Sequence, residues 1–580
     1  MTALNKEHQQ YCTQTLDAAF ASVGLNIISD VESMALANSG LIAGTFDALG
    51  IEQIIETYVG KTGSHVKVSS GAIVKALVLQ LLAAPFQSLY GTSEYFSRMP
   101  IAQLLNADIK ADDLNRHTLS RLLDDIDAVG PEKLFMRCAK AACDAFNIKV
   151  TEVQLDSTSF HYDGQSREEQ GCELVLKKGY SRDHRPELNQ VIQLGLVDGL
   201  SKFPLLFKTE SGNVNDKTSF KNLITNFGDE LKAQFQDLKY LIADSALCTT
   251  EIFKEARAKD IHVITRIPDS SEVFKNIIAT YKESELEPIY DEQDCHVYGK
   301  FCGTDVVAGQ KVKLLLISNK KMQKQKTETV NKKAEKELEA TIAKIKKLST
   351  QPKKCMKDAQ DEVLKIKNKL KYCIISDITY IDVKKNTSRG RPLKGQEAEQ
   401  KVVAVKVTAK VSIDKATVAK AIENELMFVI ATTDTRRKWK MQDLYSNYIR
   451  QSVIERKWRI CKKPSIMIDA IYLKSPRRIN ALMWIMSIAL LVYAATELKI
   501  RTSMQKHNLS IPTPDHKGTL SKPTLDRFNQ YLCNARITLT IDEMNRAYIS
   551  GITRTLASVL LVMGEHWIKY FRADYYVKKE

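Results

Sequence analysis

The feature that most constrains this chain is a change of apolar spacing after residue 150. Three apolar runs follow one another, namely EVQLDSTSF, QVIQLGLVDGLSK and FPLLFKTESGN. Asp198-Gly199 supplies a tight turn after the second run, and Ser211-Gly212-Asn213 ends the third. Apolar runs bounded by such turn residues predict three consecutive antiparallel strands.

These strands are followed by two repeats of a helix and a strand. The helical segment TSFKNLITNFGDELKAQF leads to the apolar strand LKYLIADSA, and the helix TTEIFKEARAKD leads to the strand IHVITRIP. Three antiparallel strands continued by βαβ units form a mixed sheet. This is the strand order of the ribonuclease-H-like nuclease core, so we predict an α/β fold with the first part of that core at residues 151–268.

Residues 1–150 have apolar residues at helical spacing, as in AIVKALVLQLLAA and HTLSRLLDDIDAVG. Asn115 or Asp113 is placed to cap the second of these helices. The pattern predicts an N-terminal helical domain that binds DNA. Four polar residues could form the exposed face of a helix-turn-helix reader, although an ordinary solvated helix face has the same pattern: Arg116, His117, Ser120 and Arg121.

The rest of the chain predicts three further regions. A mixed α/β insertion domain is expected at 269–440, and its Lys-rich segment 320–371 has helical spacing broken at Pro352, which predicts a helical hairpin. Strand-like runs follow it, in YCIISDITYIDV, VVAVKVTAKV and LMFVIATTD. The core then resumes at 441–500 with the helix MQDLYSNYIRQSVIERKWRICKK. The C-terminal region, 501–580, is a candidate for oligomerisation.

Composition favours a multi-domain, cytoplasmic protein with a polyanionic partner. The 580 residues carry a formal charge of +16, which favours nucleic acid through counterion release, although a basic surface can also serve solubility alone. The eleven cysteines show no CxxC pair. The apolar stretch from Ile479 to Thr496 contains Asn480 and Ser487, so we expect a buried core helix and no membrane span.

Two aspartates occupy strand positions where apolar residues are expected. Asp156 lies inside the first strand, and Asp244 lies at the carboxyl end of the fourth, where ligands of α/β sheets gather. Phosphodiester cleavage by two hard cations about 3.5 to 4 Å apart requires carboxylates that converge from different elements. A single aspartate such as Asp244 could instead cap the helix that begins near Thr249. The pair favours a metal site.

The third carboxylate is expected from a helix packed on this sheet, and Glu455 is the candidate. Glu455 follows Tyr448 by seven residues, and Lys462 follows it by fourteen. In a continuous helix this spacing drifts by only about 20° and about 40°, so the three side chains would share one face. A surface helix with chance spacing is the alternative.

These motifs resemble those of bacterial and archaeal insertion-sequence transposases of the DDE superfamily. The branch signature Tyr-x2-Arg-x3-Glu-x6-Lys matches at Tyr448, Glu455 and Lys462. Gln451 replaces the arginine, for which the resemblance implies a phosphate contact, and the adjacent Arg450 could supply a similar contact. The block GYSRDHRPELNQVIQLGLVDGLSKFPLLFKTESGNVND is also similar, and the resemblance covers roughly 110–500.

The resemblance implies a site and a reaction. Asp156, Asp244 and Glu455 would bind two Mg²⁺ or Mn²⁺ ions, and Tyr448 and Lys462 would contact phosphates of the transposon end. The implied reaction is hydrolysis at the end of the element, followed by attack of the freed 3′-hydroxyl on target DNA. The implied partners are double-stranded DNA, both terminal inverted repeats and target, and further copies of the chain, in a homodimer or higher oligomer that pairs two ends.

Two further features add DNA-binding candidates. Phe428 has the place of an aromatic residue that stacks on a flipped base in relatives, although a core phenylalanine is the alternative. Arg389 and Arg391 flank Gly390 in a motif that resembles a minor-groove hook, and a flexible basic loop is the alternative.

Three other functions compete with transposition. They are a non-catalytic DNA-binding descendant, which the intact acids disfavour, a metal-dependent nuclease without strand transfer, and a basic helical scaffold. The third is supported only by the Lys-rich hairpin.

Overall fold

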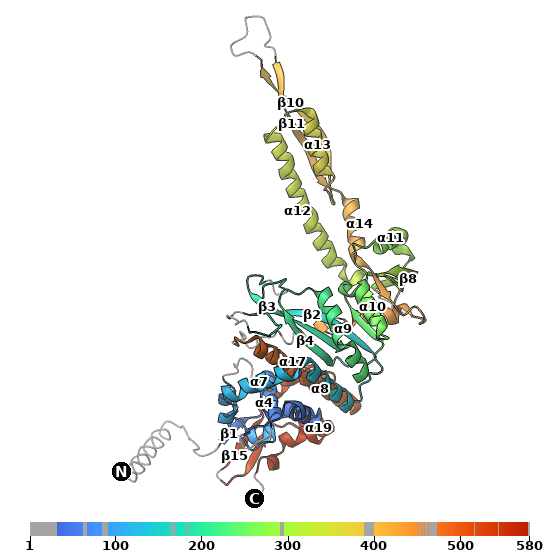
Figure 1. Cartoon of the computed structure of the whole chain (residues 1–580). Coiled ribbons are helices and arrows are strands. Elements are labelled where there is room, and N and C mark those ends of the chain that lie inside the picture. The colour runs from blue at the N-terminus through green and yellow to red at the C-terminus, as the bar shows by residue number, and fades with distance from the viewer. Residues whose placement is uncertain are drawn as a thin grey trace, which may run out of the picture. The chain divides into compact units, whose positions relative to one another are not determined.

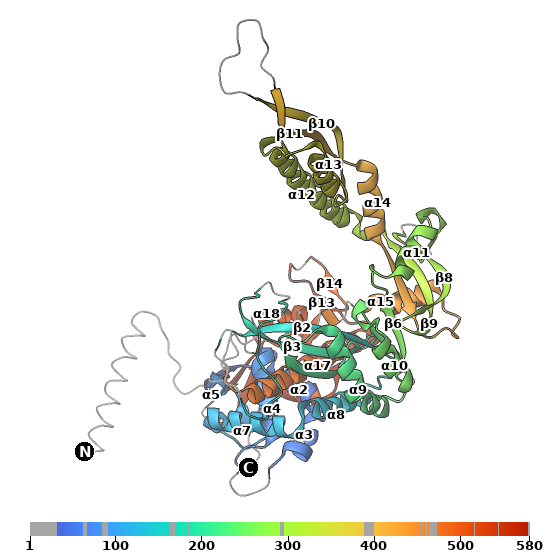
Figure 2. The same cartoon turned by 45° about the horizontal axis from the view of Figure 1, so that its top comes forward.

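The computed structural model describes residues 32–61, 66–83, 91–162, 164, 169–181, 185–290, 295–387, 400–451, 454–455, 458, 462, 473–515, 517–542 and 544–577. The chain forms two compact units, which Figures 1 and 2 show from two directions. The first unit comprises Met1–His262 and Ile449–Glu580, and the second comprises Val263–Tyr448. The second unit includes the segment for which an insertion domain is expected.

A mixed sheet forms the centre of the first unit. Its strands, in the order β4-β3-β2-β5, are β4 (Pro204–Ser211), β3 (Asn189–Asp198), β2 (Glu152–Tyr162) and β5 (Tyr240–Ala243). β3 is antiparallel to both β2 and β4, whereas β2 and β5 are parallel. His262, the first residue of β6 (His262–Arg266), donates its backbone N–H to the Lys239 carbonyl beside β5. The predicted ribonuclease-H-like strand order is therefore confirmed.

The helices between these strands begin at polar caps. The Asn215 side chain accepts a hydrogen bond from the Thr218 N–H at the start of α9 (Asp216–Gln234). The Thr249 hydroxyl accepts one from the Ile252 N–H at the start of α10 (Thr250–Ala258). These caps satisfy backbone donors that the first helical turn leaves without partners.

The N-terminal part of the first unit is helical, as predicted. Its helices are α2 (Ser39–Ala48), α3 (Ile51–Val59), α4 (Ser70–Ala83), α5 (Thr92–Phe96), α6 (Ile101–Leu105), α7 (Arg116–Val129) and α8 (Pro131–Ala145). Asn115 caps α7 by accepting hydrogen bonds from the His117 and Thr118 N–H groups, as expected from the sequence.

The long apolar helix α17 (Pro476–Lys506) packs against α2, α4, α7, α8 and β4. It is the one helix of the described chain that is long and apolar enough to cross a membrane, and 94% of its apolar window is buried. The expectation of a buried core helix is confirmed.

The C-terminal region completes the N-terminal helical part. β15 (Thr538–Ile541) pairs with β1 (Glu32–Ala35) and with β16 (Ala547–Ser550). The other elements here are β13 (Ile511–Pro512), β14 (Thr519–Leu520), α18 (Leu525–Ala535), α19 (Arg554–Met563) and α20 (Glu565–Ile568). The expected role in oligomerisation stays a prediction.

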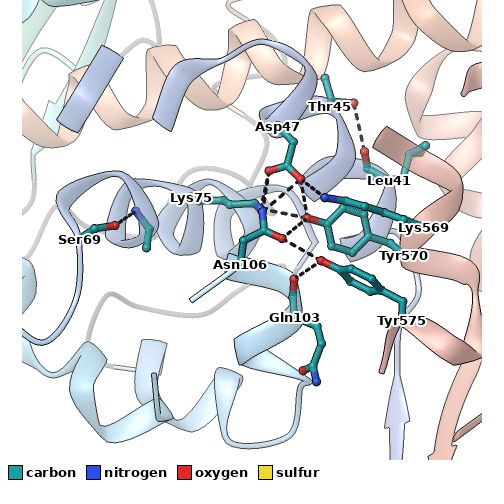
Figure 3. Close-up of polar contacts among 11 residues, drawn as sticks. Leu41, Thr45, Asp47, Ser69, Lys75, Gln103, Asn106, Lys569, Tyr570 and Tyr575 are labelled. Carbon is teal, nitrogen blue, oxygen red and sulfur yellow. Dashed lines mark hydrogen bonds and ion pairs between the residues drawn. The ribbon is translucent and has the colours of Figure 1, made fainter. Parts of the chain in front are cut away.

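A buried polar network joins the two ends of the chain (Figure 3). Lys75, which is 0% exposed, places its Nζ 2.6 Å from Asp47 Oδ1, and the Tyr570 hydroxyl donates to Asp47 Oδ2 at 2.6 Å. Lys569 Nζ lies 2.9 Å from the same Oδ2. Burial alone would raise the pKa of Asp47, but the charge of Lys75 and the hydrogen bonds outweigh it and hold the pKa below its ordinary value. The contacts of Asp47 on α2 therefore join Lys569 and Tyr570 to α2 and, through Lys75, to α4.

The second unit contains an antiparallel sheet and an arm. Its sheet has the order β6-β12-β9-β8-β7, with β12 (Met427–Thr432), β9 (Gln310–Asn319), β8 (Val297–Val307) and β7 (Glu287–Pro288), and α11 (Glu272–Thr280) lies in the same unit. The arm consists of α12 (Gln323–Thr350), α13 (Met356–Lys367), β10 (Cys373–Asn386) and β11 (Gln400–Ile413), and α14 (Lys415–Leu426) follows it. The predicted helical break near Pro352 and the predicted strands are confirmed.

Candidate active site

Asp156 lies within β2, and Asp244 directly follows the neighbouring parallel strand β5. The pairs Glu152 with Tyr240, and Gln154 with Ile242, define the register of β2 against β5. Continued by two residues, which is one residue past the end of β5, this register would bring Asp156 beside Asp244. Neighbouring strands lie about 4.8 Å apart, and residues level on parallel strands point to the same face. The register therefore predicts that both carboxylates lie side by side on one face.

Asp244 begins a turn directly after β5. Its Oδ1 accepts a hydrogen bond of 2.9 Å from the Ala246 N–H, which caps a short 3₁₀ turn at Ser245–Leu247. The alternative, in which Asp244 caps the helix near Thr249, is wrong because the Thr249 hydroxyl caps that helix itself. The Asp244 side chain is exposed and Asp156 is half-buried, so both stand at the surface of the sheet.

Trp458 docks the segment that carries Glu455 onto the face of Asp156. Gly195 is the direct partner of Asp156 across the antiparallel β2–β3 pair, so a side chain there would point to the same face. A Cβ on Gly195 would lie 2.8 Å from Trp458 Cζ2 and 2.6 Å from Phe207 Cε1. The Trp458 ring thus fills the space that glycine leaves beside Asp156. Glu455, which is exposed, precedes Trp458 by three residues, about one helical turn.

Two further contacts show that this segment runs along β2. Arg450 Nη1 lies 2.8 Å from Oε1 of the buried Glu152, at the start of the strand. Lys462 Nζ lies 5.6 Å from the ring centroid of Phe160, near its end. Glu152, Asp156 and Phe160 share one face because side chains alternate along a strand. The described residues Arg450 and Lys462 therefore contact the face of β2 that carries Asp156.

The expected continuous helix from 441 to 463 is wrong. α15 (Met441–Ile449) ends before a turn at Arg450 and Gln451, and a new helical turn begins where the Ile454 N–H donates to the Gln451 carbonyl. The cause is docking, because Arg450 pairs with Glu152 and Trp458 packs on Gly195, so the second segment follows the sheet of the first unit. Tyr448 consequently does not share a helix face with Glu455.

The DNA-binding candidates of this stretch have different surroundings. The Arg450 guanidinium is engaged by Glu152, which does not support its expected phosphate contact. Gln451 and Lys462 are half-buried, and their phosphate contacts stay predictions. Arg389 and Arg391 lie outside the described residues.

Phe428 and Tyr448 meet in the second unit. Their ring centroids are 5.9 Å apart, and Arg266 Cζ lies 5.4 Å from the centroid of Phe428. Phe428 is half-buried, whereas its neighbours Met427 and Val429 on β12 are buried. The ring therefore stands at the edge of the core beside a cation and an aromatic hydroxyl, which fits stacking better than a core position.

The carboxylates are hard oxygen donors of the kind that Mg²⁺ and Mn²⁺ prefer. Within the described part of the chain, no group of three or more His, Cys, Asp or Glu side chains is placed to hold a metal ion. The interpretation of these carboxylates as a metal site therefore rests on the register of β2 against β5 and on the docking of the segment that carries Glu455.

Sequence reasoning missed the residues that position this site, namely Glu152, Gly195 and Trp458. One signal was present for Gly195, because a glycine inside an apolar strand indicates close approach of another element. The buried Glu152 carried no such signal.

Comparisons with known proteins give two family matches. Residues 144–492 match the family described as transposase DDE domain. Residues 31–140 match a domain family of unknown function, DUF4277. No curated protein matches the sequence. Among solved structures, the chain is similar to a piggyBac transposase synaptic complex with hairpin DNA, at 9% identity and a TM-score of 0.36, over 91% of this chain and 81% of that chain.

Proposed function

Because the transposase DDE domain family spans more than half of the chain, the protein belongs to that family, and from this premise we propose that Asp156, Asp244 and Glu455 are its catalytic carboxylates. The family makes the protein a DNA transposase whose chemistry depends on a divalent metal. The observation that supports the residue assignment is the β2–β5 register, which would bring Asp156 beside Asp244 if it is continued by two residues. The docking of Trp458 on Gly195 supports the assignment of Glu455, three residues before Trp458, as the third carboxylate.

The three carboxylates would hold two Mg²⁺ or Mn²⁺ ions, which when bound supply Lewis-acid activation of the phosphate and of the attacking oxygen. In the first step, a water oxygen attacks the phosphorus at the element end, and the P–O3′ bond breaks to leave a 3′-hydroxyl and a 5′-phosphate. In the second, that 3′-hydroxyl attacks a target phosphodiester, so one P–O bond forms as another breaks. Both steps use one site.

The proposed partner is double-stranded DNA, as terminal inverted repeats and as target. The formal charge of +16 supports it, because neutralised phosphates release counterions. We place Tyr448 and Phe428 at the DNA, since the two rings and Arg266 form one group. Pairing of two ends by a homodimer or higher oligomer, and a location in the prokaryotic cytoplasm, are parts of the same proposal.

The test is strand nicking and strand transfer on labelled element-end DNA in Mg²⁺. Asp156→Asn, Asp244→Asn and Glu455→Gln should each abolish both reactions, because an amide keeps the shape and removes the metal-binding charge. Binding of end DNA in Ca²⁺ should stay within a few fold, because other residues contact the phosphates and bases. Nicking without transfer by the wild-type protein would favour the nuclease alternative.

The controls are carboxylates of the first unit that stand away from the site. The sequence suggested the turn residues Asp163 and Asp198, but Asp163 lies outside the described residues and Asp198 is 0% exposed. Asp229→Asn on α9 and Glu251→Gln on α10 are better matched, since both side chains are exposed. Normal nicking by folded Asp244→Asn protein contradicts the assignment.

A further inference from the structure

Most of the net positive charge of the protein comes from one part of the second unit. Residues 320–414, defined here as the arm, contain 25 Lys and Arg against 12 Asp and Glu, a net charge of +13. The whole chain carries +16, so the rest of it, about five times as long, carries +3. A general need for solubility would not gather the charge in this way, because solubility depends on the total.

Two acidic residues of the arm, Glu337 and Asp414, accept hydrogen bonds from backbone N–H groups. Glu337 accepts hydrogen bonds from three successive backbone N–H groups, those of Lys371, Tyr372 and Cys373, where β10 begins. Asp414 caps α14 by accepting from the Ala416 N–H. These carboxylates are fixed by backbone donors, so they hold the fold of the arm rather than neutralise its lysines.

Few lysines of the arm are paired with carboxylates. Among the described residues, the arm lysines within ion-pair distance of an acid are Lys320, Lys326, Lys333 and Lys365. Lys326 and Lys333 share one partner, Glu425. The remaining described lysines therefore present their charge to solvent, or to a ligand that replaces solvent.

The arm has a rigid scaffold behind these charges. α12 and α13 pack on one face of the β10–β11 hairpin through a buried cluster that includes Ile345, Val363 and Val407 (Figures 1 and 2). On the opposite face of β11, the exposed Lys406 and Lys410 flank Thr408 at alternate positions.

One flank of α12 also carries exposed lysines, namely Lys336, Lys344 and Lys347. At 100° per residue they lie within roughly 80° of one another around the helix. The lysines are thus displayed on regular elements with a packed core and not on a mobile tail.

We propose that the arm binds duplex DNA through its phosphates, without reading base sequence. The inference rests on the proposed function, because it takes its partner from there and adds where on the chain the duplex is held. α12 has 28 residues, so it is about 42 Å long and matches about 12 base pairs at 3.4 Å each. Lysine is suited to this task because it contacts phosphate as a point charge, and contacts to phosphate carry no sequence information.

The experiment compares two sets of lysines with equal charge loss. The arm variant carries Lys336→Gln, Lys344→Gln and Lys347→Gln. The control variant carries Lys133→Gln, Lys221→Gln and Lys254→Gln, on α8, α9 and α10 of the first unit, where all three side chains are exposed. Affinity for a 30-base-pair duplex of random sequence is measured by fluorescence anisotropy in Ca²⁺ from 50 to 300 mM NaCl, with thermal melting as the folding check.

The arm variant should lose about tenfold in affinity, and its log-log salt slope should become shallower by about 2.7, which is 0.9 for each lost phosphate contact. The control should stay within twofold. Equal effects of the two variants, or none, overturn the inference. A changed oligomeric mass of the arm variant with control-like DNA affinity also overturns it and assigns the surface to a protein partner.

Failure of the inference is distinguishable from failure of the proposed active site. If the carboxylate variants nick DNA normally while the arm variant loses affinity, the arm inference stands and the catalytic assignment falls. If wild-type protein shows no salt-dependent affinity for DNA, both fall.

Discussion

The two units position their functional residues by different physical means. In the first unit, Asp156 and Asp244 are placed by the backbone ladder of the sheet, and the Glu455 segment is placed by one ring against one glycine. In the second unit, the arm has a net charge of +13, and its exposed lysines lie on regular elements. Chemistry depends on exact position, whereas phosphate binding depends on summed charge. Single substitutions should therefore have large effects in the first unit and small, additive effects in the arm.

The largest effect on stability is expected at Lys75, in the buried network of the first unit. Lys75→Met removes the ammonium group 2.6 Å from Asp47 and leaves that carboxylate partly uncompensated. Breaking a buried pair by removing one partner costs about 3 kcal/mol or more. Urea unfolding monitored by circular dichroism should show a loss of that size. Lys140→Met, which removes the half-buried partner of Asp144 in a surface ion pair, serves as the control. Equal losses in the two variants would contradict the contrast between buried and surface charges.

The next largest effect is expected at Gly195, where an added Cβ would come closer than 3.0 Å to both Trp458 and Phe207. Gly195→Ala adds a Cβ 2.8 Å from Trp458, so the segment that carries Glu455 must move. A misplacement of about 1 Å can cost about 100-fold in rate. Nicking should fall by that order while DNA affinity is unchanged. Gly518→Ala is the control, because its Cβ would meet nothing closer than 3.7 Å. If Gly195→Ala protein nicks DNA as fast as this control, the position of the Glu455 segment does not limit the rate.

Substitutions of Phe428 test whether the second unit also contains a single side chain whose exact position affects the reaction. Phe428→Ala should slow cleavage by about tenfold, since stacking on a base contributes about 1 to 3 kcal/mol, and Phe428→Trp should restore it. The fluorescence of 2-aminopurine near the cleavage site should drop on binding to wild type and not to Phe428→Ala. If the alanine variant changes neither signal nor rate, Phe428 is a core residue.

The smallest effects are expected for single lysines of the arm. Affinity of the wild-type protein for DNA should fall steeply with salt, and Lys347→Gln alone should lower affinity less than about threefold and reduce the slope by about 0.9. A wild-type slope near zero would remove the nucleic-acid premise. A single lysine variant that abolishes binding would show that the arm acts by position and not by summed charge.

The sequence predicted the elements of the core because their periodicity and turn residues are local. The runs of β2, β3 and β4, the break near Pro352 and the buried α17 follow from apolar spacing and from proline or glycine alone. Asp156 and Asp244 could be nominated because a carboxylate inside an apolar strand is conspicuous. The sequence could not predict that the two aspartates would be level with each other, because the register depends on pairing between strands that lie 88 positions apart in the chain.

The helix around Glu455 shows where local periodicity fails. The seven-residue spacing from Tyr448 assumed a continuous helix, but Arg450 finds its partner Glu152 nearly 300 residues away, and the helix breaks there. No local signal marks that break, since the segment contains neither glycine nor proline. The same limit applies to residues 547–576, whose docking on α2 and α4 through Tyr570 is set entirely by long-range contacts.

We propose that Asp156 and Asp244 hold the catalytic metal. Replacing the carboxylate of Asp244 with a different metal ligand tests this assignment. Asp244→Cys replaces a hard oxygen donor with sulfur, which Mn²⁺ accepts more readily than Mg²⁺. Nicking of element-end DNA should fall by about 1,000-fold or more in Mg²⁺ and recover in part in Mn²⁺. Asp229→Cys should match wild type in both metals. Normal nicking by Asp244→Cys in Mg²⁺, with the protein folded, would contradict the account.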